Sequence, residues 1–212
     1  MTTRRNASIA AIVGGGGRSV QSLFAAVAGD LRAEGLCVIG VISEAHGLPD
    51  RTCSAGFLRD IATGAQFSIY LQDPPRGTSC HLDESGLDAA CGRLLQQIPG
   101  CDLIIISKFG KSEAGGRGLT PAFEAAIKAD KPILTSVSEL HLAAWRAFAP
   151  DALDLPCDAL AVRRWGETAS PATVSDAEPG GRNDPWLCDP GLRQPARESR
   201  ANKQPIDARK RK

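Results

Sequence analysis

The chain has 212 residues, enough for one α/β domain of ordinary size or for a domain with a tail. Its 25 Lys and Arg residues almost cancel its 24 Asp and Glu residues, and the net charge of +1 argues against a whole-protein electrostatic grip on nucleic acid or on an anionic membrane. Hydrophobic residues make up 42% of the chain, and none of their runs is long enough to span a membrane. The segment before the first predicted strand has no leader-type apolar stretch, so we expect a cytoplasmic protein.

The chain opens with a predicted strand–helix–strand unit. The apolar run 8–13 ends in glycines and is typical of a buried strand. From Ser19 the apolar residues recur at helical spacing, and Gly35 ends the predicted helix. Residues 36–42 form the next strand. We therefore expect 8–42 to contain a parallel pair of strands with a right-handed crossover.

The elements that follow alternate between strands and helices. In chain order they are a hairpin at 57–71 with Thr63-Gly64 in its turn, a loop at 72–84, a helix at 85–97, a buried strand at 103–106, a helix at 120–130, a strand at 132–136 and a helix at 139–148. This alternation predicts a doubly wound, mainly parallel α/β sheet with a small β-hairpin insertion. We assign residues 1–165 to this domain.

Residues 166–212 differ in composition from the predicted domain. They contain six of the 14 prolines, have little periodic apolar content and end in Arg209-Lys-Arg-Lys212. Such a composition predicts a disordered tail. The basic end leaves open a nuclear-type signal or a nucleic-acid arm, but the tail also carries acids, and a protein partner is an equally available use for it.

The seven cysteines show no C-x-x-C pair and no Cys/His spacing suited to zinc. Most are expected to be small apolar fillers in a cytoplasmic chain. Cys37 and Cys101 adjoin predicted strands, and Cys91 falls on the apolar face of a predicted helix. The cysteine pattern therefore assigns no metal site.

In doubly wound sheets, ligands bind at the carboxyl ends of the strands. Four predicted loops lie there, at 14–19, 43–56, 107–118 and 136–138. Two of them, 14–19 and 107–118, contain the glycine clusters of the chain. This coincidence is the main functional signal in the sequence.

The first cluster reads Gly-Gly-Gly-Gly-Arg-Ser and links the first strand to the first helix. Such a turn offers backbone amides and a helix N-terminus to an oxyanion. The phosphate-binding P-loop pattern G-x-x-x-x-G-K-S/T fails in both registers, because either Ile12 replaces its first glycine or Val20 replaces its lysine. The dinucleotide pattern G-x-G-x-x-G fails at Ser19. The loop is either a tight turn without a ligand or an anion site formed by Gly14, Gly15, Gly16, Gly17, Arg18 and Ser19.

The second cluster is Ser107-Lys-Phe-Gly-Lys-Ser-Glu-Ala-Gly-Gly-Arg-Gly, after the most buried predicted strand. In a nucleoside triphosphatase this strand ends in an Asp that holds Mg²⁺, whereas Ser107 stands here. We expect three cations to converge on the loop beside a single nearby acid, which suits a phosphate or another oxyanion. The residues assigned to this site are Lys108, Gly110, Lys111, Glu113, Arg117 and Gly118. The alternative is a solvated basic loop packed by Phe109.

A third candidate lies in the loop before the 85–97 helix. We expect this loop to close over a bound anion through the side chain of Arg76 and the amides of Gly77, Thr78, Ser79 and Cys80. A thiol ligand or redox role for Cys80 is the alternative, but Cys80 and His81 are adjacent and poorly placed to act as a nucleophile–base pair across a substrate. At His46 an ordinary loop is favoured over a base.

The 107–118 segment, its Ala-rich helix and Lys131-Pro-Ile-Leu-Thr-Ser-Val resemble a bacterial domain family often encoded near molybdenum-transport genes. The resemblance extends over roughly 8–165 and includes Gly77-Thr-Ser-Cys-His-Leu-Asp. That family is itself similar to small kinase-like P-loop nucleoside triphosphatases, in which an acidic pair precedes Gly and a downstream Glu. Gly110 and Glu113 match this pattern, whereas Ser107-Lys replaces the acidic pair. The first strand–helix–strand also resembles the nucleotide-binding start of the protein that assists guanylation of molybdopterin, without the P-loop lysine.

The resemblance implies a P-loop-like fold and a role in molybdenum handling. We predict a non-catalytic or weakly catalytic protein that binds a nucleotide or molybdate as its small oxyanion ligand, as an accessory to molybdenum uptake or homeostasis. One alternative is a Mg-dependent nucleoside triphosphatase or nucleotidyl-transfer accessory whose metal acid is Glu113 or Glu44. Another is a protein-interaction module that recruits its partner through the tail. A homo-oligomer is also left open.

Overall fold

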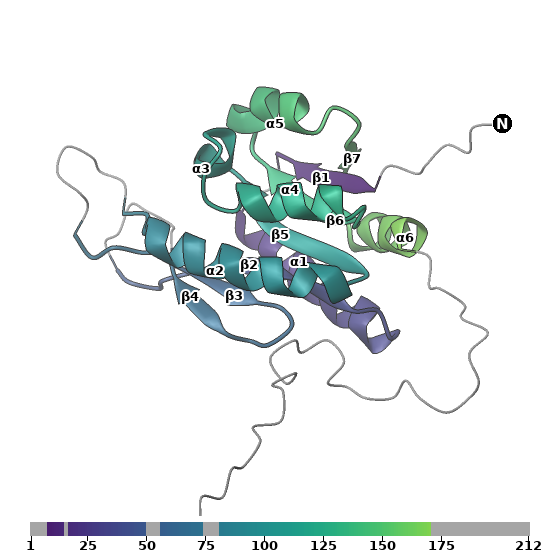
Figure 1. The fold of residues 1–212 in the computed structure, drawn as a ribbon, viewed down its shortest axis with the longest axis horizontal. Helices are drawn as coiled ribbons and strands as arrows, with labels where there is room; N and C mark the ends of the chain where they lie inside the picture. The colour runs from purple at the N-terminus through teal and green to yellow at the C-terminus, as the bar shows by residue number, and fades with distance from the viewer. Residues whose placement is uncertain (1–7, 15–16, 50–55, 74–80, 171–212) are drawn as a thin grey trace, which may run out of the picture.

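The computed structural model describes residues 8–14, 17–49, 56–73 and 81–170, which form seven strands and the helices around them (Figure 1). The strands are β1 (Ile9–Val13), β2 (Val38–Ala45), β3 (Gly56–Asp60), β4 (Gln66–Ser68), β5 (Leu103–Phe109), β6 (Ile133–Val137) and β7 (Leu153–Leu155). The α-helices are α1 (Gly17–Ala33), α2 (Glu84–Gln97), α3 (Lys111–Ala114), α4 (Thr120–Lys128), α5 (Leu142–Phe148) and α6 (Ala159–Ala169). Two short 3-10 helices, η1 (Ile98–Gly100) and η2 (Glu139–His141), complete these elements.

The strands form one sheet in the order β4-β3-β2-β5-β6-β1-β7. Every pairing among β2, β5, β6, β1 and β7 is parallel, whereas β3 is antiparallel to both β2 and β4. The predicted α/β class with a mainly parallel sheet and a hairpin is therefore confirmed, and the arrangement is consistent with a P-loop-like fold.

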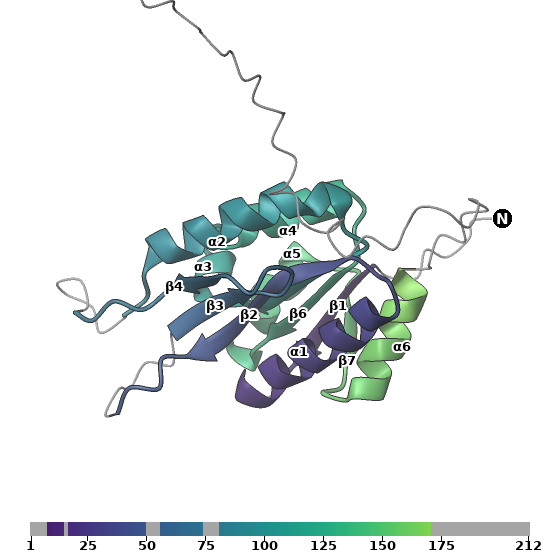
Figure 2. The ribbon, with the colours of Figure 1, turned by 90° about the horizontal axis from the view of Figure 1, so that it is seen from below.

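Helices cover both faces of the sheet, as Figure 2 shows: α2 and α4 lie on one side, and α1 and α6 lie on the other. Strand β5 explains why both faces need a cover. Its Ile104 and Ile106 are fully buried in the core shared with α2, α4 and α5, whereas Leu103 and Ile105 are fully buried in the core shared with α1 and α6. A continuous apolar run is what a central strand buried on both faces requires.

One prediction about connectivity was wrong. β1 and β2 are parallel members of one sheet but are not neighbours, because β5 and β6 lie between them. A strand–helix–strand pattern fixes the direction of the second strand, but not how many later strands are inserted between the two. The insertion matters for function, because β6 separates the strands that lead into the two glycine clusters.

The C-terminal part of the described chain contains two elements that the sequence analysis missed, β7 and α6. β7 pairs with β1, and α6 packs on α1 through buried Val162 and Trp165. Helix α6 begins with Asp158, whose side chain accepts from the amide of Ala161 at 2.8 Å, and continues to Ala169, beyond the predicted boundary at 165. The predicted tail from 171 to 212 lies outside the described residues. Within the described part of the chain, no helix is both long enough and apolar enough to cross a bilayer.

The cysteines follow the sequence expectation only in part. Cys91 and Cys101 are buried and free, and burial raises the pKa of both thiols, that of Cys101 to about 11. At neutral pH these two thiols are protonated core groups rather than nucleophiles. Cys37, in contrast, is disulfide-bonded.

Candidate functional site

The carboxyl ends of β2, β5, β6 and β1 meet at one edge of the sheet, because these four strands are parallel and adjacent in that order. β6 has β1 on one side and β5 on the other, so the loops that leave β1 and β5 flank the end of β6. The 14–19 loop leaves β1, and the 107–118 loop contains the end of β5 and the residues after it. We call this edge the carboxyl edge below.

At the end of β1 the chain turns directly into α1. Gly14 has a φ of +71°, and its amide donates to the carbonyl of Val137 at 3.0 Å, which fixes the turn to the end of β6. The first turn of α1 has no acid, and Gly17, Arg18 and Ser19 are exposed. The predicted Gly15 and Gly16 contacts lie outside the described residues.

The side chain of Gln21 connects three elements beneath this turn. Its amide nitrogen donates to the carbonyl of Ser107 at 2.9 Å, and its amide oxygen accepts from the backbone N–H of Ser43 at 2.7 Å. The hydroxyl of Ser136 donates to the same Ser107 carbonyl at 2.8 Å. The start of α1 is thereby tied to the ends of β2, β5 and β6. Sequence reasoning missed Gln21, although its polar side chain on the inward side of an apolar helix was a usable signal.

Phe109 anchors the second glycine-rich loop in the core. It is 2% exposed, and its ring lies 5.2 Å from that of Trp145, 5.3 Å from that of Phe148 and 5.9 Å from that of Phe123. This packing of Phe109 is the one expected under the alternative of a solvated basic loop. Packing of this residue still leaves the flanking Lys108 exposed at the carboxyl edge.

Glu113 closes the 110–119 loop from inside. Its side chain is almost fully buried, and its two carboxylate oxygens accept from the amides of Gly110 at 2.9 Å and Leu119 at 3.1 Å. Gly118 has a φ of +61°, and a Cβ there would lie 2.6 Å from a Glu113 oxygen. Glu113, which we had assigned to ligand binding, thus shapes the loop by bonding to its backbone.

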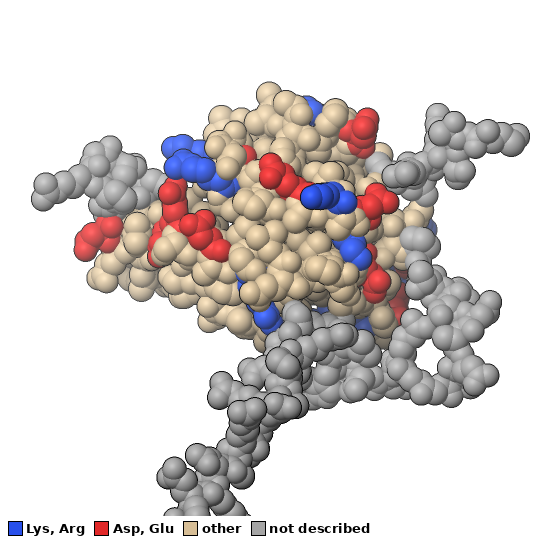
Figure 3. Space-filling model, viewed as in Figure 1, with Lys and Arg blue, Asp and Glu red and all other residues tan. Residues whose placement is uncertain are grey.

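The three cations of the second loop do not share one environment. The side chain of Lys108 lies over Gly110, with its Cε 3.7 Å from where a Cβ of Gly110 would stand, and Lys111 is exposed at the start of α3. Arg117 instead pairs with Glu84 of α2 at 3.0 Å. The expectation of Glu113 as the only nearby acid was therefore wrong. Figure 3 shows the same mixture, with basic side chains over α3 directly beside acidic ones at the start of α2.

The third predicted loop can be followed only at its ends. Arg76, Gly77, Thr78, Ser79 and Cys80 lie outside the described residues, so their closing over an anion stays a prediction. His81, just after them, shares its Nδ1 in a hydrogen bond with the Leu71 carbonyl at 2.8 Å and stacks on Tyr70 with ring centroids 5.3 Å apart. His46 lies on the same tyrosine, with centroids 4.6 Å apart. In these contacts the rings of His46 and His81 both pack against Tyr70.

Comparison with known families identifies the domain that carries this edge. The profile of the family described as "Protein of unknown function (DUF2478)" matches residues 9–165, nearly all of the described sheet and helices. The chain belongs to this family. The match confirms the predicted resemblance to a family without an assigned role, whereas its genomic neighbourhood stays a prediction. No solved structure matches the chain.

The DUF2478 chain also resembles part of a transport protein. It is 32% identical over 155 residues, which are 71% of this chain, to the "Molybdenum import ATP-binding protein ModC 2" of Bradyrhizobium diazoefficiens. The alignment spans 17% of that protein's length. Because so little of the relative is covered, the match does not show that the shared segment is the part of that protein that binds ATP or imports molybdenum.

Glu44, the other acid proposed for metal binding, is already paired in this DUF2478 domain. Its carboxylate accepts from Nε of Arg59 at 2.6 Å and from the Arg59 Nη2 at 2.9 Å, and Gln66 donates to it at 3.1 Å. The hydrogen bonds from Arg59 are the main reason why the pKa of Glu44 lies below its usual value. The pair joins β2 to β3, so Glu44 stabilises the antiparallel part of the sheet.

Proposed function

We propose that this DUF2478 protein binds a tetrahedral oxyanion, a nucleotide phosphate or molybdate, at the carboxyl edge. The observation that carries the proposal is the placement of both glycine-rich loops around the end of β6, with the Gln21 side chain holding α1 against β5. Ligands of doubly wound sheets bind at such edges. The 76–80 loop is proposed as the third part of the site.

Three features of the edge favour a negatively charged ligand. The first is the N-terminus of α1, where the helix dipole and amides without intrahelical partners attract anions, and where no acid stands in the first turn. The second is the exposed side chain of Arg18 in that turn. The third is the exposed pair Lys108 and Lys111 on the other side of β6. Arg117 contributes less, since Glu84 already neutralises part of its charge.

The proposed activity is binding with little or no catalysis. The lysine of a P-loop is missing, because its position falls on Arg18 in one register and on Val20 in the other, and Ser107 takes the place of the Mg²⁺-holding Asp. These two groups provide most of the charge neutralisation in phosphoryl transfer, so a site without them retains affinity for phosphate more readily than it retains hydrolysis.

The relative supports the proposal of a role in molybdenum uptake or homeostasis. A segment 32% identical to this chain occurs within a protein named for molybdenum import and ATP binding. We propose that the segment and this chain share a ligand that appears in that process, which makes molybdate and nucleotides the first candidates. Both ligands present tetrahedral oxyanions that the same amides and cations can bind.

The test is calorimetry and thermal shift with molybdate, tungstate, sulfate, phosphate, ATP and GTP at low salt. At least one should bind and raise the melting temperature, as ligand linkage requires. The triple variant Arg18→Gln, Lys108→Gln and Lys111→Gln should lose about tenfold or more in affinity, because each cation contributes a charge-assisted contact. The matched control is Lys128→Gln with Arg164→Gln, two exposed cations on the outer helices α4 and α6.

Three outcomes decide between this proposal and its alternatives. If no anion binds at millimolar concentration, the proposal fails. If the control variant loses as much affinity as the triple variant, the site lies elsewhere. If the protein releases phosphate from ATP or GTP with Mg²⁺ at enzymatic rates, and Glu113→Gln abolishes that release without unfolding, it is a nucleoside triphosphatase rather than a binding protein.

A further inference from the structure

Among the cysteines that the structure describes, Cys37 is the one that is disulfide-bonded. The others that it describes, Cys91, Cys101 and Cys157, are free. The partner of Cys37 is therefore one of the three cysteines outside the described residues, namely Cys53, Cys80 or Cys188. The contacts of described residues next to these three positions decide which of them can reach Cys37.

Cys37 lies at the edge of the sheet opposite the carboxyl edge, which we call the amino edge. It directly precedes Val38, the first residue of β2, and Val38 pairs with Leu103, the first residue of the parallel strand β5. The amide of Cys37 donates to the Asp102 carboxylate at 2.7 Å, and its carbonyl accepts from the Asp102 amide at 2.8 Å. Cys37 is half-buried in this position, so its sulfur atom is not sealed in the core.

Cys53 is too far from the amino edge to form the disulfide. Gly56, three positions after Cys53, pairs with Ala45 at the carboxyl end of β2. The eight positions from Cys37 to Ala45 span about 26 Å of strand. Three residues of chain reach back at most about 11 Å. Bonded cysteines have Cα atoms within about 7 Å of each other, so the gap cannot be closed.

Cys80 is excluded by its neighbour His81. The ring of His81 stacks on Tyr70 with centroids 5.3 Å apart, and Tyr70 contacts the ring of His46 with centroids 4.6 Å apart. His46 directly follows β2 at the carboxyl edge, about 30 Å of strand from Cys37. A single peptide separates neighbouring Cα atoms by about 3.8 Å, so Cys80 cannot reach Cys37.

Cys188 remains, and the described chain ends beside Cys37. The hydroxyl of Ser170 donates to the carbonyl of Asp102 at 3.0 Å, and Asp102 is the residue bonded to Cys37. The chain after Ser170 therefore starts at the amino edge, and Cys188 follows eighteen positions later. Eighteen residues can span up to about 60 Å, so the length of chain is ample for a return to Cys37.

We infer that Cys37 and Cys188 form a reversible disulfide, which ties the C-terminal segment to the amino edge when oxidised and releases it when reduced. The two protein thiols and one molecule of glutathione disulfide exchange to give one protein disulfide and two molecules of reduced glutathione. In this exchange a protein thiolate attacks the small disulfide, and the second protein thiolate displaces glutathione from the mixed disulfide. An excess of reduced glutathione reverses both steps.

The other described cysteines of the core do not compete for the oxidant. Cys91 and Cys101 are buried, and burial raises the pKa of both thiols, so they stay protonated and enclosed at neutral pH. In reducing compartments, protein disulfides are usually transient and redox-sensing. The pair thus makes attachment of the C-terminal segment depend on the thiol–disulfide balance around the protein.

The first experiment identifies the bond by mass spectrometry. The full chain is oxidised with glutathione disulfide, its remaining thiols are alkylated, and it is digested with trypsin without reduction. Cleavage after Lys and Arg places Cys37 in peptide 33–51, Cys53 in 52–59, Cys80 in 77–93 and Cys188 in 183–193. Peptide 33–51 should be joined to 183–193, and dithiothreitol should separate the two. A link from 33–51 to 52–59 or to 77–93, or no link at all, would overturn the inference.

The second experiment tests reversibility with variants of the full chain. On a non-reducing denaturing gel, the oxidised wild type should migrate faster than the reduced protein, because the disulfide closes most of the chain into a loop. Cys37→Ser and Cys188→Ser should each abolish this shift, whereas the control Cys157→Ser, at an exposed free cysteine, should keep it. A shift that survives Cys188→Ser would overturn the inference. Anion affinity should be equal in the oxidised and reduced protein, because the carboxyl edge lies at the other end of the strands, so this test and that of the proposed function fail separately.

Discussion

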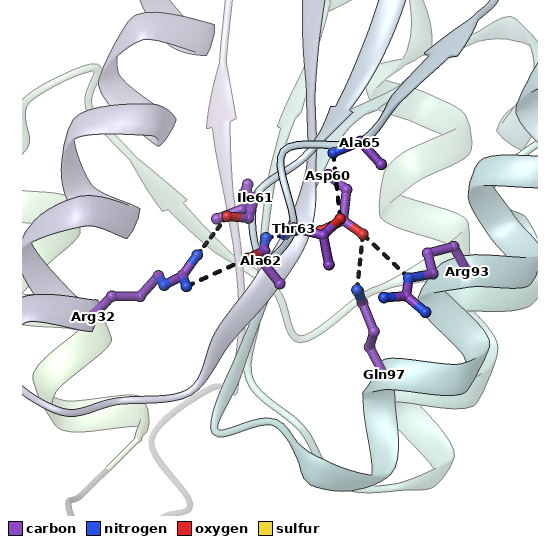
Figure 4. A network of polar contacts seen from close by, with 8 residues as sticks. All are labelled: Arg32, Asp60, Ile61, Ala62, Thr63, Ala65, Arg93 and Gln97. Atoms are coloured by element: carbon purple, nitrogen blue, oxygen red, sulfur yellow. Dashed lines mark hydrogen bonds and ion pairs between the residues drawn. The ribbon is translucent and has the colours of Figure 1, made fainter. Parts of the chain in front are cut away.

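Two buried polar residues of this protein, Asp60 and Ser107, are bonded to their surroundings through different groups, Asp60 through its side chain and Ser107 through its backbone carbonyl. Asp60 at the end of β3 is fully buried, and Figure 4 shows its carboxylate among four donors from the hairpin turn and α2. The partners are the amide of Ala62 at 2.7 Å, the amide of Thr63 at 3.1 Å, the side chain of Gln97 at 2.8 Å and that of Arg93 at 3.5 Å. Ser107 is almost as buried, and its carbonyl accepts from the side chains of Gln21 and Ser136.

The two residues stabilise different parts of the sheet: Asp60 organises the hairpin turn, and the Ser107 carbonyl ties the end of β5 to α1 and β6. The turn held by Asp60 is also held from the other face of the sheet, where the Arg32 guanidinium of α1 donates to the carbonyls of Ile61 and Ala62 (Figure 4). A buried carboxylate with this many partners stabilises one conformation and has little capacity left for a ligand.

Removal of Asp60 should have the largest effect on stability. Asp60→Ala removes the acceptor of the buried Gln97 side chain and of two backbone amides, and it breaks the ion pair with the half-buried Arg93, which should together cost about 3–4 kcal/mol in the free energy of unfolding. Urea denaturation measures the loss. The anion affinity of the remaining folded protein should be unchanged, because the turn lies away from the carboxyl edge.

The control for this variant is Asp88→Ala on the exposed surface of α2, which should change stability by no more than about 0.5 kcal/mol. A stability loss below that of the control would show that the Asp60 network is not structural. A loss of anion affinity without a loss of stability would make the two regions functionally equivalent and end the comparison.

Gly118→Ala should have the next largest effect on stability, because Gly118 lies in the loop whose backbone is bonded to Glu113. The new Cβ would require a residue other than glycine at a φ of +61° and would stand 2.6 Å from a Glu113 oxygen. Together these should cost about 1–3 kcal/mol in the free energy of unfolding. Gly116→Ala is the matched control: its φ is +71°, but nothing lies within 4 Å of its Cβ position. Equal losses in the two variants would mean that contact with Glu113 contributes nothing.

Glu113→Gln should lower the free energy of unfolding by about 1–2 kcal/mol. The substitution replaces one carboxylate oxygen with an NH₂ group, a donor that faces a backbone N–H where an acceptor is needed. The exposed Glu124→Gln on α4 should leave stability unchanged. If Glu113 only shapes the loop, this loss of stability should accompany any loss of anion affinity, and both can be measured on one sample by denaturation with and without ligand. A folded variant of wild-type stability that has lost anion binding would instead place Glu113 in contact with the ligand.

Much of the fold was predictable because its signals are local. The apolar run at 103–106 predicted a strand, and the helical spacing after Ser19 predicted a helix, and both predictions are correct for β5 and α1. A strand buried on both faces is apolar throughout, whereas a helix buried on one face has apolar residues three or four positions apart. β7 was missed because a three-residue edge strand, with Leu153 half-exposed, has no such pattern. The order of strands was not predictable from 8–42 alone, because it depends on contacts made by residues a hundred positions later.

The placement of the two glycine-rich loops at one edge was predictable, but their contacts were not. The end of β1 and the end of β5 were placed at one edge by the rule that parallel strands end together, and the structure has them there. The bond between Gln21 and Ser107 spans 86 positions and leaves no mark in a short motif. Nor did the sequence show that Arg117 turns toward Glu84, since that pair depends on how α2 packs beside α4.

The smallest expected effect concerns Glu139, the exposed acid beside Gly14, and it tests the proposed oxyanion site through a charge of the opposite sign. If the ligand is an anion without Mg²⁺, the carboxylate of Glu139 repels it across solvent, and Glu139→Gln should strengthen binding about two- to fivefold. The gain should shrink as salt is raised, because salt screens exposed charges over about 10 Å at moderate ionic strength. Glu124→Gln, which changes the net charge equally on the outer face of α4, separates this local effect from a change in overall charge.

If Glu139 instead held a cation that bridges to the ligand, the same substitution would weaken binding, and EDTA would weaken binding to the wild type as well. A gain in affinity would therefore place the anion near Glu139, an acid that limits how tightly it is held.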